Sequence, residues 1–317
     1  MTSIKNNKVI FASIGIAFSI AILMNGCKEV GPIVPWGNNG TFTDTSYIES
    51  PAQAPQPKNA LIEEITGITC PNCPASHVVL DNLITSTNNR VIGVSYHLST
   101  SLCDQDGPPP AGAYQNLTST DAQTIVKSGF SGGYPGFAPS GAVDRIVHQN
   151  VGPFSATGIW DGPQDWSSYV NTELAETTPV NIYLTSIFNS STSLKQINIY
   201  VGLHYTSAQT DTDKLSIFLT EDSIISAQLL QGTTSDLDDS FYVHNHIMRA
   251  AVTNPLGNVI PAPSFVKGRV DSLAFTYTFS PADSLWNPAH MNVVAFVHKY
   301  QNGRNDILQS QMIKVIP

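Results

Sequence analysis

The residues with the clearest chemical potential are two cysteines in the segment Cys70-Pro-Asn-Cys73. The segment follows an apolar stretch over residues 60–66 that predicts a strand, and it precedes apolar residues at helical spacing. A thiol at the start of a helix is favoured as the thiolate, because the helix dipole and unpaired N–H groups stabilise negative charge. We therefore expect Cys70 to be the more exposed and more acidic thiol. Cys73 would lie about one helical turn further on, within reach of a disulfide.

The same cysteine spacing also opens many zinc sites, which need a second pair of Cys or His ligands. No second Cys-x-x-Cys occurs in the sequence, so the pattern favours a redox pair or a disulfide over zinc. His244 and His246 are two residues apart in an expected strand and would face the same side. Nothing in the sequence places a third ligand beside them, so we expect no metal site and no cofactor.

The N-terminus has the composition of an export signal. Two lysines precede an apolar run over residues 9–24, and these 16 residues are short for a transmembrane helix of about 20. The Gly-Cys pair that ends at Cys27 resembles the junction of a bacterial lipoprotein signal, whose cysteine is lipidated. Residues 1–27 are therefore expected to be a lipoprotein signal peptide and lipidation site, an uncleaved membrane anchor being the alternative. Lys28, rather than an aspartate, follows the cysteine, and by resemblance to the sorting rules of bacterial lipoproteins this favours the outer membrane over the inner one.

Composition fits an exported protein and excludes some partners. The formal net charge is −9, and without the two signal lysines it becomes −9 − 2 = −11. Such an acidic chain is not expected to bind nucleic acid. The low share of charged residues, 12%, favours strands and loops over long helices. The expected partners are the outer membrane, through the lipid anchor, and an unknown protein or surface ligand. Cys103 is left as the odd cysteine.

The pattern along the chain predicts a tether followed by two domains. Residues 28–58 are rich in Pro, Gly, Asn and Thr without apolar periodicity, which is typical of an extended tether. Residues 59–178 alternate strands and helices, as in a partly parallel α/β sheet. Pro179 marks the boundary to the second domain. The elements expected in the first domain are strands over 60–66, 91–96 and 140–145, and helices over 77–84, 121–127 and 166–174.

The second domain, residues 179–317, is expected to be all-β and to fold on its own. Short stretches with strand character are separated there by Asn, Ser, Asp and Gly. About seven strands with such turns predict an antiparallel sandwich close to an immunoglobulin-like arrangement. The stretches cover residues 180–188, 195–205, 214–220, 243–252, 269–279, 292–298 and 307–315.

The order strand, Cys-x-x-Cys, helix, strand, helix, Pro, strand resembles the thioredoxin fold. Glu64 stands where thioredoxins keep a buried acid, and Pro139 where they keep a cis-proline beside the disulfide. Further motifs make the chain from about residue 58 onward similar to the outer membrane protein 28-related lipoprotein family. These motifs are Glu63-Glu64-x-x-Gly67, Cys70-Pro-Asn-Cys73-Pro74, Tyr96-His97, Pro139-Ser-Gly-Ala-Val-Asp-Arg145 and Tyr242-Val-His-Asn-His246-Ile-Met-Arg249. The resemblance implies a thioredoxin-like α/β domain followed by a β-sandwich.

Two functions follow from this resemblance. The family is known as surface proteins, which implies an outer-membrane lipoprotein with a binding or adhesion role and a thioredoxin-like scaffold. The alternative is a membrane-anchored thiol–disulfide oxidoreductase in which Cys70 attacks, Cys73 resolves, Glu64 moves a proton and Pro139 shapes the peptide groove. Thioredoxins keep a tryptophan before the first cysteine, and this chain has a threonine there. The adjacent Glu63 would also raise the pKa of at least one acid of the pair. These departures favour the scaffold.

Overall fold

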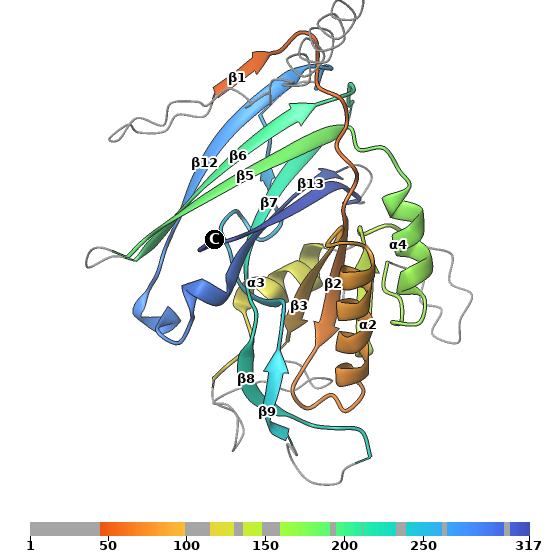
Figure 1. Cartoon of the computed structure of the whole chain (residues 1–317), viewed down its shortest axis with the longest axis vertical. Helices are drawn as coiled ribbons and strands as arrows, with labels where there is room; N and C mark the ends of the chain where they lie inside the picture. The colour runs from red at the N-terminus through yellow and green to blue at the C-terminus, as the bar shows by residue number, and fades with distance from the viewer. Residues whose placement is uncertain are drawn as a thin grey trace, which may run out of the picture. The chain divides into compact units, whose positions relative to one another are not determined.

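The computed structural model describes residues 45–98, 115–129, 136–147, 159–190, 195–210, 212–232, 239–261, 265–300 and 305–317. The expected signal peptide with Cys27, and also Cys103, lie outside the described residues. Residues Thr43–Pro317 form one compact unit, in which strands predominate (Figure 1). Among the described helices, none combines the length and the apolar character needed to cross a membrane.

The larger sheet, called the main sheet below, has eight strands. Its order is β14-β13-β7-β10-β3-β2-β4, with β11 paired to β7. β3 is parallel to both β2 and β10, and the other neighbours are antiparallel. The strands are β2 (Ala60–Thr66), β3 (Val91–His97), β4 (Ser140–Val143), β7 (Thr212–Glu221), β10 (Ile247–Ala251), β11 (Asn258–Val259), β13 (Met291–Tyr300) and β14 (Ile307–Lys314).

A second, four-stranded sheet packs on one part of the main sheet. Its order is β1-β12-β6-β5, and all its neighbours are antiparallel. Alternate side chains of these strands, such as Ile182 and Ile199, share a hydrophobic cluster with Ile217 and Val293 of the main sheet. The strands are β1 (Thr45–Ile48), β5 (Val180–Asn189), β6 (Gln196–Tyr205) and β12 (Arg269–Thr278). A separate two-stranded hairpin consists of β8 (Ile224–Gln228) and β9 (Asp239–His244).

Two helices cover one face of β2. Leu80 and Leu83 of α2 share a cluster with Trp166 of α4 and Ile62 of β2. Gly141 on β4 permits this packing, because a Cβ atom there would lie 2.5 Å from the Trp166 ring. The helical elements are α2 (Cys73–Ser86), α3 (Thr120–Thr124), the π-helical turn η1 (Ile125–Gly129), α4 (Trp166–Leu174) and the 3-10 turns η2 (Pro281–Asp283) and η3 (Pro288–His290). The order β2, α2, β3, α3, β4 is the order expected from the sequence.

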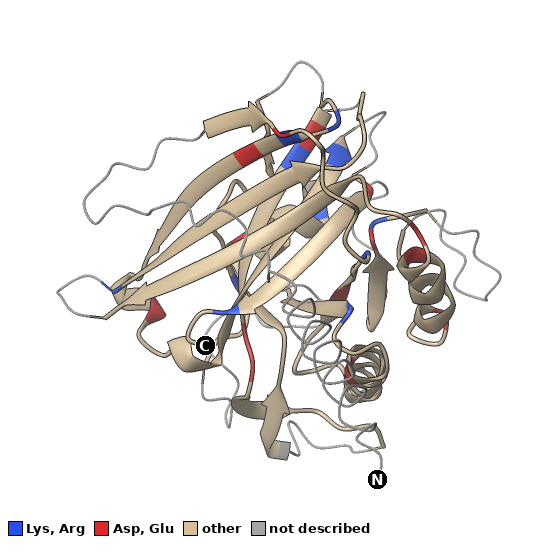
Figure 2. Cartoon of the chain, turned by 45° about the horizontal axis from the view of Figure 1, so that its top comes forward, with Lys and Arg blue, Asp and Glu red and all other residues tan. Residues whose placement is uncertain are grey.

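Charged side chains are sparse on the four-stranded sheet. β5 and β6 contain no Lys, Arg, Asp or Glu, and both strands are tan along their length in Figure 2. On β12 the charges come at the start of the strand, where Arg269 pairs with Asp271 at 2.7 Å. The outer face of this sheet is therefore largely neutral.

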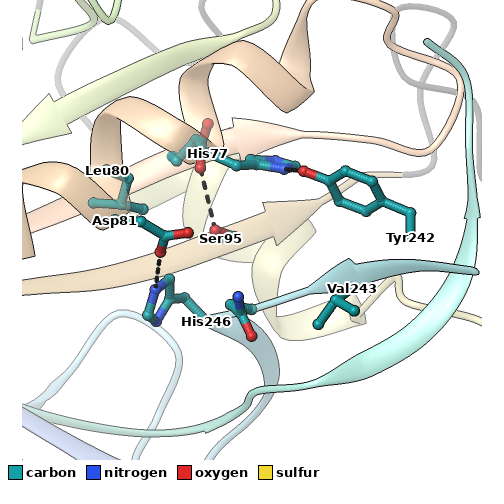
Figure 3. Close-up of a pocket in the computed structure, with 9 residues that line it drawn as sticks. His77, Leu80, Asp81, Ser95, Tyr242, Val243 and His246 are labelled. Carbon is teal, nitrogen blue, oxygen red and sulfur yellow. Dashed lines mark hydrogen bonds and ion pairs between the residues drawn. The ribbon is translucent and has the colours of Figure 1, made fainter.

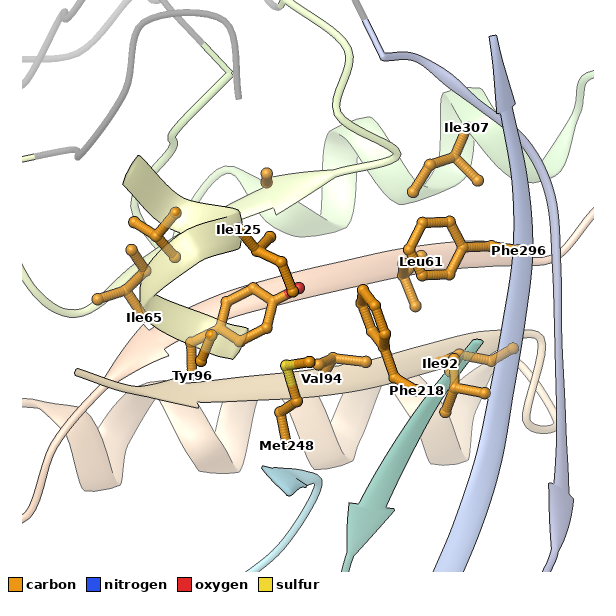
Figure 4. Packing of buried hydrophobic residues seen from close by; sticks show 14 of the residues in the cluster. Leu61, Ile65, Ile92, Val94, Tyr96, Ile125, Phe218, Met248, Phe296 and Ile307 are labelled. Carbon is orange, nitrogen blue, oxygen red and sulfur yellow. The ribbon is translucent and has the colours of Figure 1, made fainter. Parts of the chain in front are cut away.

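The two expected domains share a sheet and a core. β10 pairs with β3 across the expected boundary, so that Ile247 lies opposite Ser95. One hydrophobic cluster combines Leu61 of β2 with Phe218 of β7 and Phe296 of β13 (Figure 4). The boundary near residue 178 stays a prediction, but the segments on its two sides are not independent bodies.

Part of the expected tether belongs to the folded unit. β1 pairs with β12 at one edge of the four-stranded sheet. At the other edge, the Gln56 N–H donates to Asn181 Oδ1 at 2.7 Å, and the Ile182 N–H donates to Gln56 Oε1 at 3.2 Å. The prediction of an extended tether over residues 28–58 is therefore wrong for residues 45–58. Its backbone pairs with distant strands, which local periodicity does not reveal.

The strands expected in the second half are all present, with one difference. The stretch over residues 243–252 is broken, because β9 ends at His244 and β10 begins at Ile247. His246 lies at the break with φ of 60°. β8 is not among the expected strands, and it pairs with β9 outside the main sheet. The break allows the β8–β9 hairpin to leave the main sheet.

The shared core reverses the expectation that residues 179–317 fold alone. Isolating them would expose the β10 edge and the apolar side chains that pack on β2 and β3. We expect residues 43–317 to unfold in one cooperative thermal transition followed by circular dichroism. The fragment 179–317 should show no such transition and little dispersion in its amide NMR spectrum. A cooperative transition in the isolated fragment would contradict this account.

Candidate functional site

The two cysteines form a disulfide where β2 leads into α2, in a segment called the disulfide turn below (residues 67–73). Cys70 and Cys73 are bonded to each other, with Cα atoms 5.4 Å apart. α2 begins at Cys73 rather than at Cys70, and the Cys73 N–H donates to the Cys70 carbonyl at 3.2 Å. Cys70 is the more exposed of the two, but only 4% of it is accessible and Cys73 is fully buried. The disulfide is therefore largely enclosed in this conformation.

Glu63 and Glu64 are neighbours in β2 but face opposite sides of the main sheet, because side chains alternate along a strand. Arg145 pairs with Glu63 in a bidentate manner, with Nε–Oε2 and Nη2–Oε1 distances of 2.6 and 2.7 Å. The Tyr96 hydroxyl also donates to Glu63. The expected effect of Glu63 on the pKa of Glu64 is therefore wrong. Burial is the main cause of the raised pKa of Glu64, and Glu63 is not among its causes.

Glu64 faces α2 and is held by two hydroxyl groups. Ser76 of α2 donates to Glu64, and Ser95 of β3 donates to it at 3.3 Å. Burial raises the pKa of Glu64 to about 7, because the carboxylate loses its hydration, and the two hydrogen bonds oppose this rise. The Ser76 hydroxyl also lies 2.8 Å from the Cys73 carbonyl oxygen. One hydroxyl thus connects the carboxyl group of Glu64 to the disulfide turn.

Pro139 lies near the same end of the main sheet. The Ala138–Pro139 peptide bond is cis. The next residue, Ser140, begins β4 and pairs with Ile65 near the end of β2. The structure therefore brings Cys70, Cys73, Glu64 and Pro139 to the end of β2, although Pro139 comes from a distant part of the sequence.

The β8–β9 hairpin lies against the disulfide turn, and sequence reasoning missed it. The Gln228 side-chain amide donates to the Cys70 carbonyl at 3.0 Å. The Leu229 N–H donates to the Ile68 carbonyl at 2.8 Å. β8 has only five residues, too few for the alternation of its side chains to predict which segment it contacts. Nothing in the residue types of β8 predicts contact with the cysteines. The hairpin is part of the site because it binds the backbone that carries Cys70.

A small cleft opens beside Glu64, between α2, the main sheet and β9 (Figure 3). It has about 30 Å³ of space for water, enough for roughly two molecules. At its edge, His246 Nε2 lies 3.2 Å from Asp81 Oδ1, and the Asp81 side chain is half exposed. The lining residues are Glu64, His77, Leu80, Asp81, Ser95, Tyr242, Val243, Asn245 and His246. The cleft thus places the buried carboxyl group of Glu64 beside space for water.

His77 connects α2 to the hairpin. Its Nε2 lies 2.8 Å from Thr66 Oγ1, and its Nδ1 lies 2.7 Å from the Tyr242 hydroxyl oxygen. Burial lowers the pKa of His77 to about 3, because the imidazolium would lose its hydration. The ring is therefore neutral near pH 7, with one nitrogen donating and the other accepting. The Thr66 and Tyr242 hydroxyls consequently play opposite roles toward it.

His244 and His246 diverge rather than face one side. His244 packs edge-on against His97, with ring centroids 5.5 Å apart. His246 follows the break in the strand and pairs with Asp81 and Asp222. The expectation of a shared side is wrong because strand alternation ends at this break. Within the described ranges, no group of three His, Cys, Asp or Glu side chains is arranged to hold a metal ion.

Comparison with known proteins gives a family match and a shared fold. A family model described as outer membrane protein Omp28 matches residues 134–316. The solved structure of HBP35 of Porphyromonas gingivalis shares 15% identity and a TM-score of 0.59, over 83% of this chain and 77% of that one. A domain of the outer membrane lipoprotein Omp28 from the same organism has 17% identity and a TM-score of 0.29, over 44% of this chain and 90% of that one. No curated protein matches the sequence significantly.

Glu64 should make the stability of the protein depend on pH. Its native pKa of about 7 lies above the ordinary value of 4.5, so the native state holds an extra proton between these values. Its contribution to stability is therefore complete below pH 4.5 and falls as pH rises to about 7. Relative to Glu64→Gln, the wild type should lose up to roughly 3 kcal/mol of unfolding free energy across this window.

Urea unfolding of both proteins between pH 4 and 8 measures this loss. Burial also raises the pKa of Glu173 to about 7, so Glu173→Gln serves as the matched control for a carboxyl group titrating in the same window. Parallel stability curves for the wild type and Glu64→Gln would show that Glu64 does not titrate in this way.

Proposed function

The chain belongs to the outer membrane protein Omp28 family, and from this premise we propose that it binds surface ligands or mediates adhesion, with its thioredoxin-like part serving mainly as a scaffold. An outer-membrane location follows from the family. The observation that carries the proposal is the enclosure of the disulfide. Both cysteines are buried, and Gln228 binds the backbone of the turn that carries them. A disulfide in this setting stabilises the fold without exchanging with a substrate.

The neutral face of the four-stranded sheet supports a binding role. β5 and β6 carry no charged residue, and Tyr183 and Ile187 of β5 are 44% and 49% exposed. We assign the sandwich of residues 179–317 to the immunoglobulin-like class, whose rigid strands present loops for recognition. Such a surface suits an uncharged protein or surface ligand better than a charged one.

Attachment to the outer membrane is assigned to a lipid on Cys27, which ends the lipoprotein-like signal. Lipid modification of this cysteine would hold the folded unit at the membrane without a spanning helix. Mass spectrometry of the mature N-terminus tests the assignment. An unmodified Cys27, or cleavage at another position, would refute it.

The second candidate function is thiol–disulfide exchange, and Glu64 favours it. A buried acid with a raised pKa beside a disulfide turn can accept and return a proton near pH 7. In this role the reduced Cys70 attacks a substrate disulfide and releases one substrate thiol, and Cys73 resolves the mixed disulfide by releasing the second thiol and forming the Cys70–Cys73 bond. The pair is oxidised as the substrate is reduced, while Glu64 moves the proton and Pro139 shapes the peptide groove. The enclosed disulfide counts against this function, because a substrate sulfur must reach Cys70 in line with its bond.

Replacing the disulfide separates the two functions. The change Cys70→Ser, Cys73→Ser should cost roughly 2 kcal/mol or less, since the closed loop is only a few residues long. Cells that display this variant should attach to immobilised matrix proteins and glycans as well as cells with the wild type do, and cells lacking the protein should attach less.

A redox enzyme would give the opposite pattern. The purified wild type would then reduce or oxidise a peptide disulfide catalytically and lose this activity with Cys70→Ser alone. Catalytic turnover of this kind, or equal attachment of cells with and without the protein, would overturn the scaffold proposal.

A further inference from the structure

The β8–β9 hairpin leaves the main sheet level with Glu64. Glu64, Ser95, Ile247 and Glu221 are paired in one row across β2, β3, β10 and β7. β8 begins three residues after Glu221, and β9 ends three residues before Ile247. Among the described residues, β8 and β9 form a two-stranded sheet of their own, which two short connections join to the main sheet. It can therefore move without breaking the pairing of the main sheet.

Each of the two connections contains a residue in the left-handed backbone region. Ser223 has φ of 58° and His246 has φ of 60°. The Ser223 N–H donates to Asn245 Oδ1, and the His246 N–H donates to Asp222 Oδ1, both at 2.9 Å. These hydrogen bonds join the two connections to each other, and the His246 ring also lies 3.2 Å from Asp81 Oδ1 of α2. They can persist while the hairpin swings, so the connections have the character of a paired hinge.

The inner side of the hairpin contacts the disulfide turn through a few polar groups. The Gln228 amide donates to the Cys70 carbonyl at 3.0 Å and to the Gly67 carbonyl at 3.3 Å. The Tyr242 hydroxyl lies 2.7 Å from Nδ1 of His77 on α2. These groups can bind water when they separate, so each contact adds only a small net stability.

The inner side of the hairpin is packed, and the outer side is open. Ile224 and Ala227 of β8 join Ile68 of the disulfide turn in a cluster of five residues. His244 of β9 packs against His97 of β3, and the Leu229 N–H donates to the Ile68 carbonyl. On the outer side, the cross-strand pair Ile225 and Val243 is 50% and 48% exposed. The hairpin is thus held from one side only, in contrast to β2 and β3, which are buried throughout.

From this arrangement we propose that the β8–β9 hairpin is a hinged lid that controls access to the Cys70–Cys73 disulfide, with Gln228 and Tyr242 as its latches. The same movement would open the cleft beside Glu64, since Tyr242 and Val243 form part of its wall (Figure 3). The proposal goes beyond the binding role, because it concerns access to the disulfide whether or not the protein turns over a substrate.

The test measures how fast dithiothreitol reduces the disulfide in the folded, full-length chain. Each reaction oxidises the two reagent thiols to a cyclic disulfide, while Cys70 and Cys73 gain the two electrons and two protons. Iodoacetamide then traps the free thiols, and mass spectrometry of the peptide containing both cysteines reports the reduced fraction. Trypsin cleaves after Lys58 and Arg90, so Cys27 and Cys103 fall in different peptides.

Loosening a latch should speed reduction. Tyr242→Phe should raise the rate roughly fivefold, as expected for the loss of one hydrogen bond. Gln228→Ala removes the hydrogen bonds to the Cys70 and Gly67 carbonyls and should raise the rate by at least as much. The matched controls are Gln196→Ala and Tyr183→Phe on the four-stranded sheet, which lose side-chain hydrogen bonds to Thr278 and Gln53 respectively. They should react at the wild-type rate.

The urea dependence of the rate identifies the movement. A lid exposes little surface when it opens, so the wild-type rate should change little at low urea concentration. Amide hydrogen exchange in the wild type gives a second measurement if a variant fails to fold. Amides of β8 and β9 should open at a lower free energy than those of β13.

Three results would overturn the lid. The latch variants could react no faster than their controls, or reduction could follow the urea dependence of global unfolding. The wild type could also react as fast as the unfolded chain, which would mean that nothing gates the disulfide.

Discussion

The burial of β2 on both faces is the constraint on which the rest of the structure depends. All seven of its residues are buried, including two adjacent acids. A buried carboxyl group is stable only where hydrogen-bond donors or a cation contact it. Glu63 requires Arg145 on one face, and Glu64 requires Ser76 on the other. Since β2 leads directly into the disulfide turn, these pairings also fix where Cys70 lies. Glu63 and Glu64 thus have a structural role that does not depend on catalysis.

The strand order explains why a hairpin from the second half of the chain covers a site in the first half. β10 pairs with β3, so the connection between β7 and β10 emerges beside the disulfide turn. The chain keeps the acid and the cis-proline expected of a thioredoxin-like site, yet it encloses the sulfur atoms that such a site must present. An enclosed disulfide in a sheet continuous with a packed sandwich is better suited to hold a shape than to exchange with substrates. Opening of the proposed lid would give reagents access to the Cys70–Cys73 disulfide.

Local patterns in the sequence predicted most of the helices and strands, but they could not predict contacts between distant segments. Alternation and helical spacing found β2, β3 and α4 to within a residue or two. The same patterns missed β1, because a Pro-rich segment forms a strand only where the edge of β12 accepts it. They also merged β9 with β10, since a single residue, His246, breaks the strand through its backbone conformation. Of the site, the cysteines, Glu64 and Pro139 followed from the resemblance, while Gln228 and His77 required the three-dimensional contact of the hairpin.

The reduction potential of the Cys70–Cys73 pair tests the central claim most directly. Equilibration of the folded protein with dithiothreitol mixtures, followed by alkylation and mass spectrometry, gives this value. A structural disulfide enclosed by the fold should have a potential below about −300 mV. A potential between about −270 and −120 mV, the range of working oxidoreductases, would contradict the scaffold and favour thiol–disulfide exchange.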